Sequence, residues 1–101
     1  MSTPSTYQNN IVGPVMRQGD LAKAVAEAAV IDNPNKEVRV DDKVAYVRIQ
    51  AEDEMVLKRA TIEEMLGRPF NMREIEVDLS SFAGRIEISP ERVRFYYEKH
   101  L

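Results

Sequence analysis

Cysteine is missing from this chain of 101 residues. Its absence excludes a disulfide framework, a thiolate zinc site, an iron–sulfur cluster and a cysteine nucleophile, and it is compatible with a reduced cytosol. Histidine occurs once, as His100, next to the C-terminus, where a solvated tail residue is expected. A histidine-based triad or an imidazole-rich metal site cannot be built from this residue.

The sequence also has no block of basic residues and no long apolar run. Lys and Arg number 14 against 17 Asp and Glu, a formal net charge of -3, so the basic surface of a nucleic-acid-binding protein is not expected. No apolar run approaches the roughly 20 residues of a membrane-spanning helix. The N-terminal residues MSTPSTYQNN lack the basic and apolar regions of a secretory signal. We therefore expect a cytoplasmic protein with no nucleic-acid or membrane partner.

The length predicts one domain. Residues 1–9 are mostly small and polar and include a proline, which predicts a flexible N-terminal tail. Residues 10–101 carry the apolar patterns and form the single domain.

The first half of this domain predicts a strand, a helix and a strand hairpin. The apolar run 11–16 contains Pro14, which cannot donate to a sheet ladder, so an edge strand or an extended arm is expected. Asp20 is a candidate N-cap for a helix that extends to Ile31, because small and apolar residues recur there at spacings of three and four. Two alternating segments follow, 38–40 and 44–49, joined by a short acidic turn.

The second half repeats this order loosely. Thr61 and Glu64 are spaced as a capping box at the start of a short helix that ends at Gly67. Apolar residues alternate with acidic ones over 74–79, which predicts a half-buried strand. The remaining predictions are a strand at 55–57, a loop at 80–84 and a hairpin of strands 85–88 and 93–97. The order favours an α+β fold of two βαββ-type units, about residues 10–50 and 55–97.

Carboxylates are the only abundant groups that could do acid–base chemistry, and local structure accounts for each cluster. The run 52–54 lies in a predicted turn, and the capping box with the helix dipole accounts for Glu63 and Glu64. Glu74, Glu76 and Asp78 share the predicted exposed face of a strand. No Glu-x-x-His pair is present to supply ligands for a di-iron centre. We therefore expect no catalytic residue, no metal ligand and no cofactor.

Several short strings are more specific than these patterns, and they occur in order over about residues 9–99. They are NIVGPVMR at 10–17, GDL at 19–21, IDNP at 31–34, AYVRI at 45–49, LGRPFNM at 66–72, DLSSFAGR at 78–85 and RFYY at 94–97. Together they resemble the effector (coupling or regulatory) proteins of bacterial soluble di-iron monooxygenases, with the toluene monooxygenase effectors as the nearest branch. The resemblance implies an α+β protein without cofactor that binds the hydroxylase component and tunes its turnover, coupling and regiospecificity. It also implies a system with a Rieske-type ferredoxin and a flavin reductase.

The resemblance places a docking loop at 78–85, and we expect contacts with the hydroxylase from this segment. The alternative is a plain connection between strands, with Phe82 folded into the core. The residues concerned are Asp78, Ser80, Ser81, Phe82, Gly84 and Arg85.

Two further segments are candidates for the same interface. The first is the arm with Asn10, Val12, Met16 and Arg17, which is equally compatible with an ordinary strand that packs inward. The second is Asn33, which stands before a proline, so turn chemistry alone can also account for it.

Two other functional classes compete with the effector interpretation. A small-ligand allosteric sensor domain built from βαββ units would need a Gly-rich ligand loop, which this chain lacks. An enzyme with paired carboxylates is disfavoured, because every acidic cluster has a structural explanation.

Overall fold

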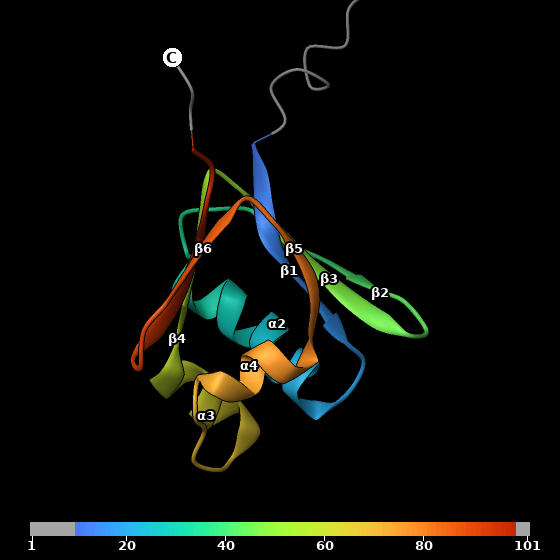
Figure 1. Cartoon of the computed structure of the whole chain (residues 1–101), viewed down its shortest axis with the longest axis vertical. Helices are drawn as coiled ribbons and strands as arrows, with labels where there is room; N and C mark the ends of the chain where they lie inside the picture. The colour runs from blue at the N-terminus through green and yellow to red at the C-terminus, as the bar shows by residue number, and fades with distance from the viewer. Residues whose placement is uncertain (1–9, 99–101) are drawn as a thin grey trace, which may run out of the picture.

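A computed structural model describes residues 10–98 (Figure 1). The predicted tail 1–9 and His100 lie outside these described residues. In chain order the elements are β1 (Ile11–Arg17), α2 (Asp20–Asp32), β2 (Arg39–Asp42), β3 (Tyr46–Glu52), β4 (Glu54–Lys58), α3 (Arg59–Leu66), α4 (Arg73–Asp78), β5 (Leu79–Ala83), β6 (Arg85–Ile88) and β7 (Arg92–Tyr96).

The strands form two antiparallel sheets that lean against each other above the helices (Figure 1). One sheet has the order β2-β3-β1-β5 and the other the order β4-β7-β6. Helix α2 lies in the angle between them, with α3 and α4 below it. The largest fully buried side chains come from both sheets and from α3 and α4: Phe95, Met16, Ile49, Met55, Leu57, Ile62 and Ile75. The predicted α+β fold class is therefore confirmed.

Two single residues carry the chain from one sheet to the other. Asp53, at φ 71°, joins β3 to β4, and Gly84, at φ 88°, joins β5 to β6. A Cβ atom on Gly84 would lie 2.6 Å from Cγ1 of Val12 and 2.7 Å from the Tyr96 carbonyl oxygen, so only glycine fits this corner without a shift. The Asp53 corner is tied by two backbone bonds: its N–H donates to the Asn10 carbonyl (2.9 Å), and its carbonyl accepts from the Tyr97 N–H (2.8 Å).

The prediction of an edge strand or extended arm at 11–16 is wrong, because β1 lies between β3 and β5. Pro14 is accommodated because the β1–β3 pairing skips Gly13 and Pro14, while both residues pair with β5. The Ile49 carbonyl oxygen lies only 2.0 Å from the position of a Cβ on Gly13. The interrupted ladder thus removes the need for a proline N–H inside the sheet.

The helix starts differ from the predicted caps. Gly19, not Asp20, is the N-cap of α2, and no side chain caps that end. Helix α3 begins at Arg59, so Thr61 lies inside its first turn and the predicted capping box is wrong. Instead, Asp32 at the end of α2 accepts the Lys58 N–H and the Thr61 hydroxyl, both at 2.8 Å. One helix end therefore caps the next. The predicted end of α3 at Gly67 is confirmed.

The predicted strand over 74–79 is also wrong, because Arg73–Asp78 form the short helix α4. Asn71 starts this helix: its Oδ1 accepts the Arg73 N–H (2.9 Å), and its own N–H donates to the Glu74 carboxylate (3.1 Å). The acidic residues at 74, 76 and 78 therefore lie on a helix and not on one strand face. The predicted loop 80–84 is mostly strand, as β5 covers Leu79–Ala83, and the β6–β7 hairpin is confirmed.

Candidate docking surface

Strand β5 lies at the edge of the four-stranded sheet and pairs only with β1. Its central residues, Ser80, Ser81 and Phe82, are all exposed. The two serine hydroxyls make no hydrogen bond with any residue in the range 10–98. The segment therefore presents polar groups and one free backbone edge outward.

Charge distinguishes β5 from the other strands at the sheet edges. Arg39–Asp42 of β2, Glu54–Lys58 of β4 and Arg85–Ile88 of β6 each carry at least two charged residues, whereas β5 has the uncharged sequence LSSFA. Charged side chains on an edge strand oppose pairing with other chains, because burial of the charge is costly. Among the described strands, β5 is thus the edge that another protein can cover at the lowest desolvation cost.

The sequence left open whether Phe82 contacts the hydroxylase or folds into the core, and its position is compatible with both. Its ring lies 6.0 Å from the ring of the fully buried Phe95, at an interplanar angle of 53°. The same side chain is 41% exposed. The core therefore holds Phe82 in place while much of its surface remains available, as expected of a preorganised contact residue.

The other residues of the predicted docking loop flank β5. Asp78 is half-buried at the end of α4, and Gly84 forms the corner between the sheets. Arg85 is exposed at the start of β6 and forms an ion pair with Glu98 at 2.7 Å.

The structure places the predicted arm directly beside this loop, because β1 pairs with β5. Val12 and Met16 nevertheless face the core and are fully buried, so they cannot contact a partner in this conformation. Asn10 is half-buried beside the Asp53 corner, where its side chain donates to the Asp53 carboxylate, and Arg17 is exposed. The alternation of β1 thus gives the arm an inward face and an outward one.

Asn33, the third candidate, is a structural residue with an exposed fraction of only 7%. Its Nδ2 donates to the carbonyls of Ala29 and Val56, both at 2.8 Å, and its Oδ1 accepts the Val56 N–H at 3.0 Å. The side-chain amide pairs with β4 as a neighbouring strand would. These bonds give Asn33 a structural role in the fold, and its contact with the hydroxylase stays a prediction.

Among the residues that sequence reasoning missed is the outward-facing Val15, which stands opposite Ser81 in the β1–β5 register. Val15 is half-buried and lies on the face opposite to Val12 and Met16. The alternation along β1 contains this information, but apolar residues occur on both faces, so the pattern alone does not say which face is outward.

The charged groups with shifted pKa values have structural partners. Hydrogen bonding to Glu54 raises the pKa of Arg94, and hydrogen bonding to Glu91 raises that of Arg59. A hydrogen bond from Arg68 lowers the pKa of Glu74, helped by the Asn71 N–H. Within residues 10–98, no three His, Cys, Asp or Glu side chains are grouped to hold a metal ion.

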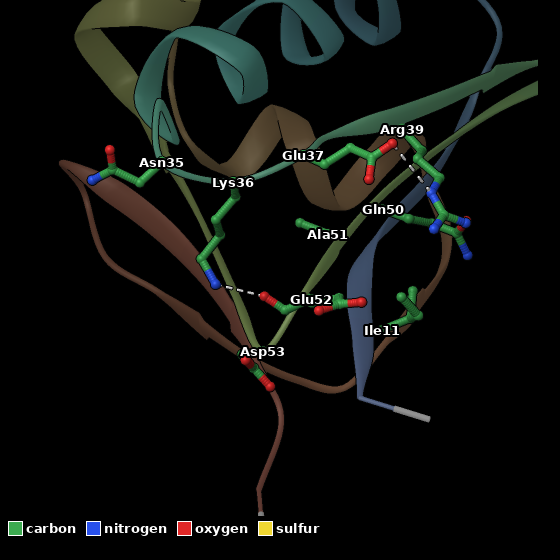
Figure 2. Close-up of a pocket in the computed structure, with 9 residues that line it drawn as sticks. All are labelled: Ile11, Asn35, Lys36, Glu37, Arg39, Gln50, Ala51, Glu52 and Asp53. Atoms are coloured by element: carbon green, nitrogen blue, oxygen red, sulfur yellow. Dashed lines mark hydrogen bonds and ion pairs between the residues drawn. The ribbon is translucent and has the colours of Figure 1, made fainter. Parts of the chain in front are cut away.

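A hollow of about 310 Å³ lies beside the end of β3 (Figure 2). Four of its five charged side chains have a partner within the protein: Lys36 donates to the Glu52 backbone carbonyl, Arg39 lies 4.0 Å from the Glu37 carboxylate, and the Asp53 carboxylate accepts from Asn10. A small-ligand site would need polar groups that converge on an empty space without partners. The hollow therefore gives no support to the sensor alternative.

These features define a small α+β binding module: a buried core, an uncharged sheet edge and exposed polar residues held on rigid elements. Within residues 10–98, no helix is long and apolar enough to cross a membrane.

Comparison with known proteins identifies the family. The MmoB/DmpM family model matches residues 10–96, and the chain belongs to this family. It is 46% identical over 97 residues to the effector subunit of the alkene monooxygenase system of Xanthobacter autotrophicus strain Py2, covering 96% of both chains. It is 32% identical over 84 residues to the stimulatory component of phenol 2-monooxygenase from Pseudomonas sp. strain CF600, covering 83% of this chain and 91% of the relative.

A solved structure agrees with these matches. The chain superimposes on a component of a phenol hydroxylase–regulatory protein complex with a TM-score of 0.75 and 31% identity, covering 87% of this chain and 99% of the other. The protein is accordingly an effector component of a multicomponent monooxygenase and not a catalytic subunit.

Proposed function

We propose that this protein docks on the di-iron hydroxylase of an aromatic or alkene monooxygenase through β5 and the Gly84 corner. The observation that carries the proposal is the uncharged, exposed edge of β5, with Phe82 anchored on the core beside it. The regulatory protein with the same fold is part of a complex with phenol hydroxylase, which supports the choice of partner.

Docking acts on the partner by shifting its conformations. An effector that binds one hydroxylase conformation better than another changes their populations, and a tenfold change needs about 1.4 kcal/mol of differential affinity. Control of substrate access and of the geometry of the active site then raises turnover and coupling and sets regiospecificity.

The finer parts of the proposal follow from the sequence resemblance. The complete system includes a Rieske-type ferredoxin and a flavin reductase, and all components act in the cytoplasm. Toluene is one candidate substrate. The 46% identity to an alkene monooxygenase effector also favours a test of small alkenes.

Titration of the cognate hydroxylase, with its ferredoxin and reductase, tests this function directly. We expect a saturable rise in the oxidation rate or in coupling, with a plateau near one effector per active site. An unchanged rate, coupling and product distribution at saturating effector would refute the proposal.

The docking residues are tested by the double variant Ser80→Ala/Ser81→Ala. We expect the Kd for the hydroxylase to rise several-fold with an unchanged Tm, because neither hydroxyl has a partner within residues 10–98. Ser89→Ala is the control, since Ser89 is also exposed but lies in the β6–β7 turn, where its hydroxyl bonds with Arg92. A lower Tm with an unchanged Kd for the double variant would show that the serines have only a structural role.

A further inference from the structure

The four-stranded sheet has an outer face that no described helix covers. Helix α2 packs against the inner face, where Val12, Met16 and their neighbours are buried (Figure 1). On the outer face, Val15 of β1 stands directly opposite Arg48 of β3, and Arg17 stands opposite Tyr46. Because opposed residues in an antiparallel pair point to the same side, these four side chains share one surface.

Two arginines on this face form no ion pair within residues 10–98. Arg17 and Arg48 are exposed, and neither forms an ion pair or a side-chain hydrogen bond with any residue from 10 to 98. Asp41 stands opposite Arg48 on β2, but its carboxylate forms an ion pair with Lys43 at 3.4 Å. Asp41 shares this face and offsets part of the positive charge, but Arg17 and Arg48 lie diagonally across β1 and β3 with Lys43 nearby. The face therefore keeps an excess of positive charge that an acidic partner would complement.

The arginines are surrounded by side chains that suit a protein interface. Tyr46 and Val15 are half-buried, and Val44, in the turn before Tyr46, is 97% exposed. Gln18 holds this turn: its Nε2 donates to the Asp42 carboxylate (2.6 Å) and to the Lys43 carbonyl (2.8 Å). Tyrosine and arginine next to aliphatic surface are enriched at protein–protein contacts. The fixed turn means that little order has to be gained on binding.

The face is continuous with the surface already assigned to docking. Ser81 of β5 stands opposite Val15 of β1, so the outer face extends from β3 across β1 to the β5 edge. A partner that covers β5 reaches the arginines without leaving this sheet.

We propose that the outer face of the four-stranded sheet is part of the hydroxylase interface, and that Arg17 and Arg48 bind carboxylates on the hydroxylase. The surface consists of Val15, Arg17, Val44, Tyr46, Arg48 and Ser81. This inference rests on the proposed function and adds the chemistry of the partner surface. The planar guanidinium matches a carboxylate in a two-point contact, which gives both affinity and orientation.

The double variant Arg17→Gln/Arg48→Gln tests the proposal, with the Kd for the hydroxylase measured at low and high salt. We expect the Kd to rise at least about tenfold at low salt, because two charge-assisted contacts are lost. The difference from the wild type should shrink at high salt, where ions screen the charges. The Tm should remain that of the wild type, since neither side chain has a partner within the described residues.

Arg92→Gln is the matched control. Arg92 is exposed, and its guanidinium likewise has no partner among the described residues, but it lies on β7 of the other sheet, opposite Lys58. Its loss changes the net charge by one unit without touching the proposed surface, so its Kd should stay within about twofold of the wild type. An equal effect of Arg92→Gln and of either single variant, Arg17→Gln or Arg48→Gln, would reduce the finding to a general charge effect and overturn the proposal.

The outcomes separate this inference from the proposed function. If the wild type does not bind the hydroxylase, the proposed function itself fails. If the wild type binds and the double variant binds equally well, only the role of the two arginines is refuted. Sedimentation of the free protein adds a further outcome: a wild-type dimer that the double variant abolishes, with an unchanged Kd, would assign the face to a second copy of this chain.

Discussion

Asn33 shows how one side chain can hold two elements of this molecule together. It follows the last residue of α2 and pairs through three hydrogen bonds with Ala29 and with both backbone groups of Val56. Proline at the next position biases Asn33 away from helical geometry, so the helix ends where the amide can reach β4. The sequence marks the turn, but the bond to a strand 23 residues further on is visible only in the fold.

Asn33→Ala is therefore expected to lower stability and leave docking unaffected. The substitution removes three hydrogen bonds and leaves the Val56 groups and the Ala29 carbonyl to find other partners, a loss of roughly 1–3 kcal/mol in the free energy of unfolding. Urea denaturation measures this loss. Asn35→Ala is the control, because Asn35 is exposed in the same loop. A higher Kd for the hydroxylase with unchanged stability of Asn33→Ala would instead show that Asn33 contacts the hydroxylase.

At the scale of the elements, α2 and α4 show what periodicity can and cannot predict. Helix α2 spans 13 residues, long enough for small and apolar residues at spacings of three and four to distinguish it from a strand. Helix α4 spans six residues and buries only Ile75, so the apolar residues at 75 and 77, followed by Leu79 at the start of β5, fit a strand equally well. Contacts of Asn71 and Arg68 with residues of α4 favour the helix, and the spacing of apolar residues gives no information about such contacts.

The start of α4 predicts a pH dependence. Arg68 and the Asn71 N–H bond the Glu74 carboxylate and lower its pKa below the ordinary 4.5. A carboxyl with a lowered pKa in the folded state stabilises the fold above its unfolded pKa, and the contribution is lost as the pH falls. The loss of stability in Glu74→Gln should thus be fully present above the ordinary pKa of 4.5 and should fade as the pH falls below it, through the lowered pKa of the folded state.

Urea denaturation of Glu74→Gln and of the wild type at a series of pH values from 3 to 7 measures this difference in stability. Glu76→Gln is the control, because Glu76 lies on the same helix and is exposed, and it forms no ion pair or side-chain hydrogen bond within residues 10–98. A constant difference between Glu74→Gln and the wild type from pH 3 to pH 7 would contradict the role of the charged carboxylate.

At the scale of the molecule, the two sheets differ in how their charged side chains are paired. In the three-stranded sheet, Arg94 of β7 forms ion pairs with Glu54 and Glu87 on the two neighbouring strands and lies 4.1 Å above the Tyr96 ring. The four-stranded sheet carries the uncharged edge of β5 and two arginines without partners in the described range. The sequence predicts a docking segment at 78–85, and only the register shows that β1 and β3 lie on the same surface as β5.

This difference between the sheets predicts where amide hydrogen exchange changes when the hydroxylase binds. Amide groups of β5 that point away from β1 have no strand partner, so they exchange with solvent in the free protein and should slow markedly under a docked partner. The amides of Ser89 and Glu91 lie in the turn of the β6–β7 hairpin, on the other sheet, and should exchange at the same rate with and without the hydroxylase. Mass spectrometry of exchanged peptides distinguishes the two regions. Protection of the turn with unchanged exchange in β5 would place the interface on the three-stranded sheet, because a partner slows only the amides that it covers or stabilises.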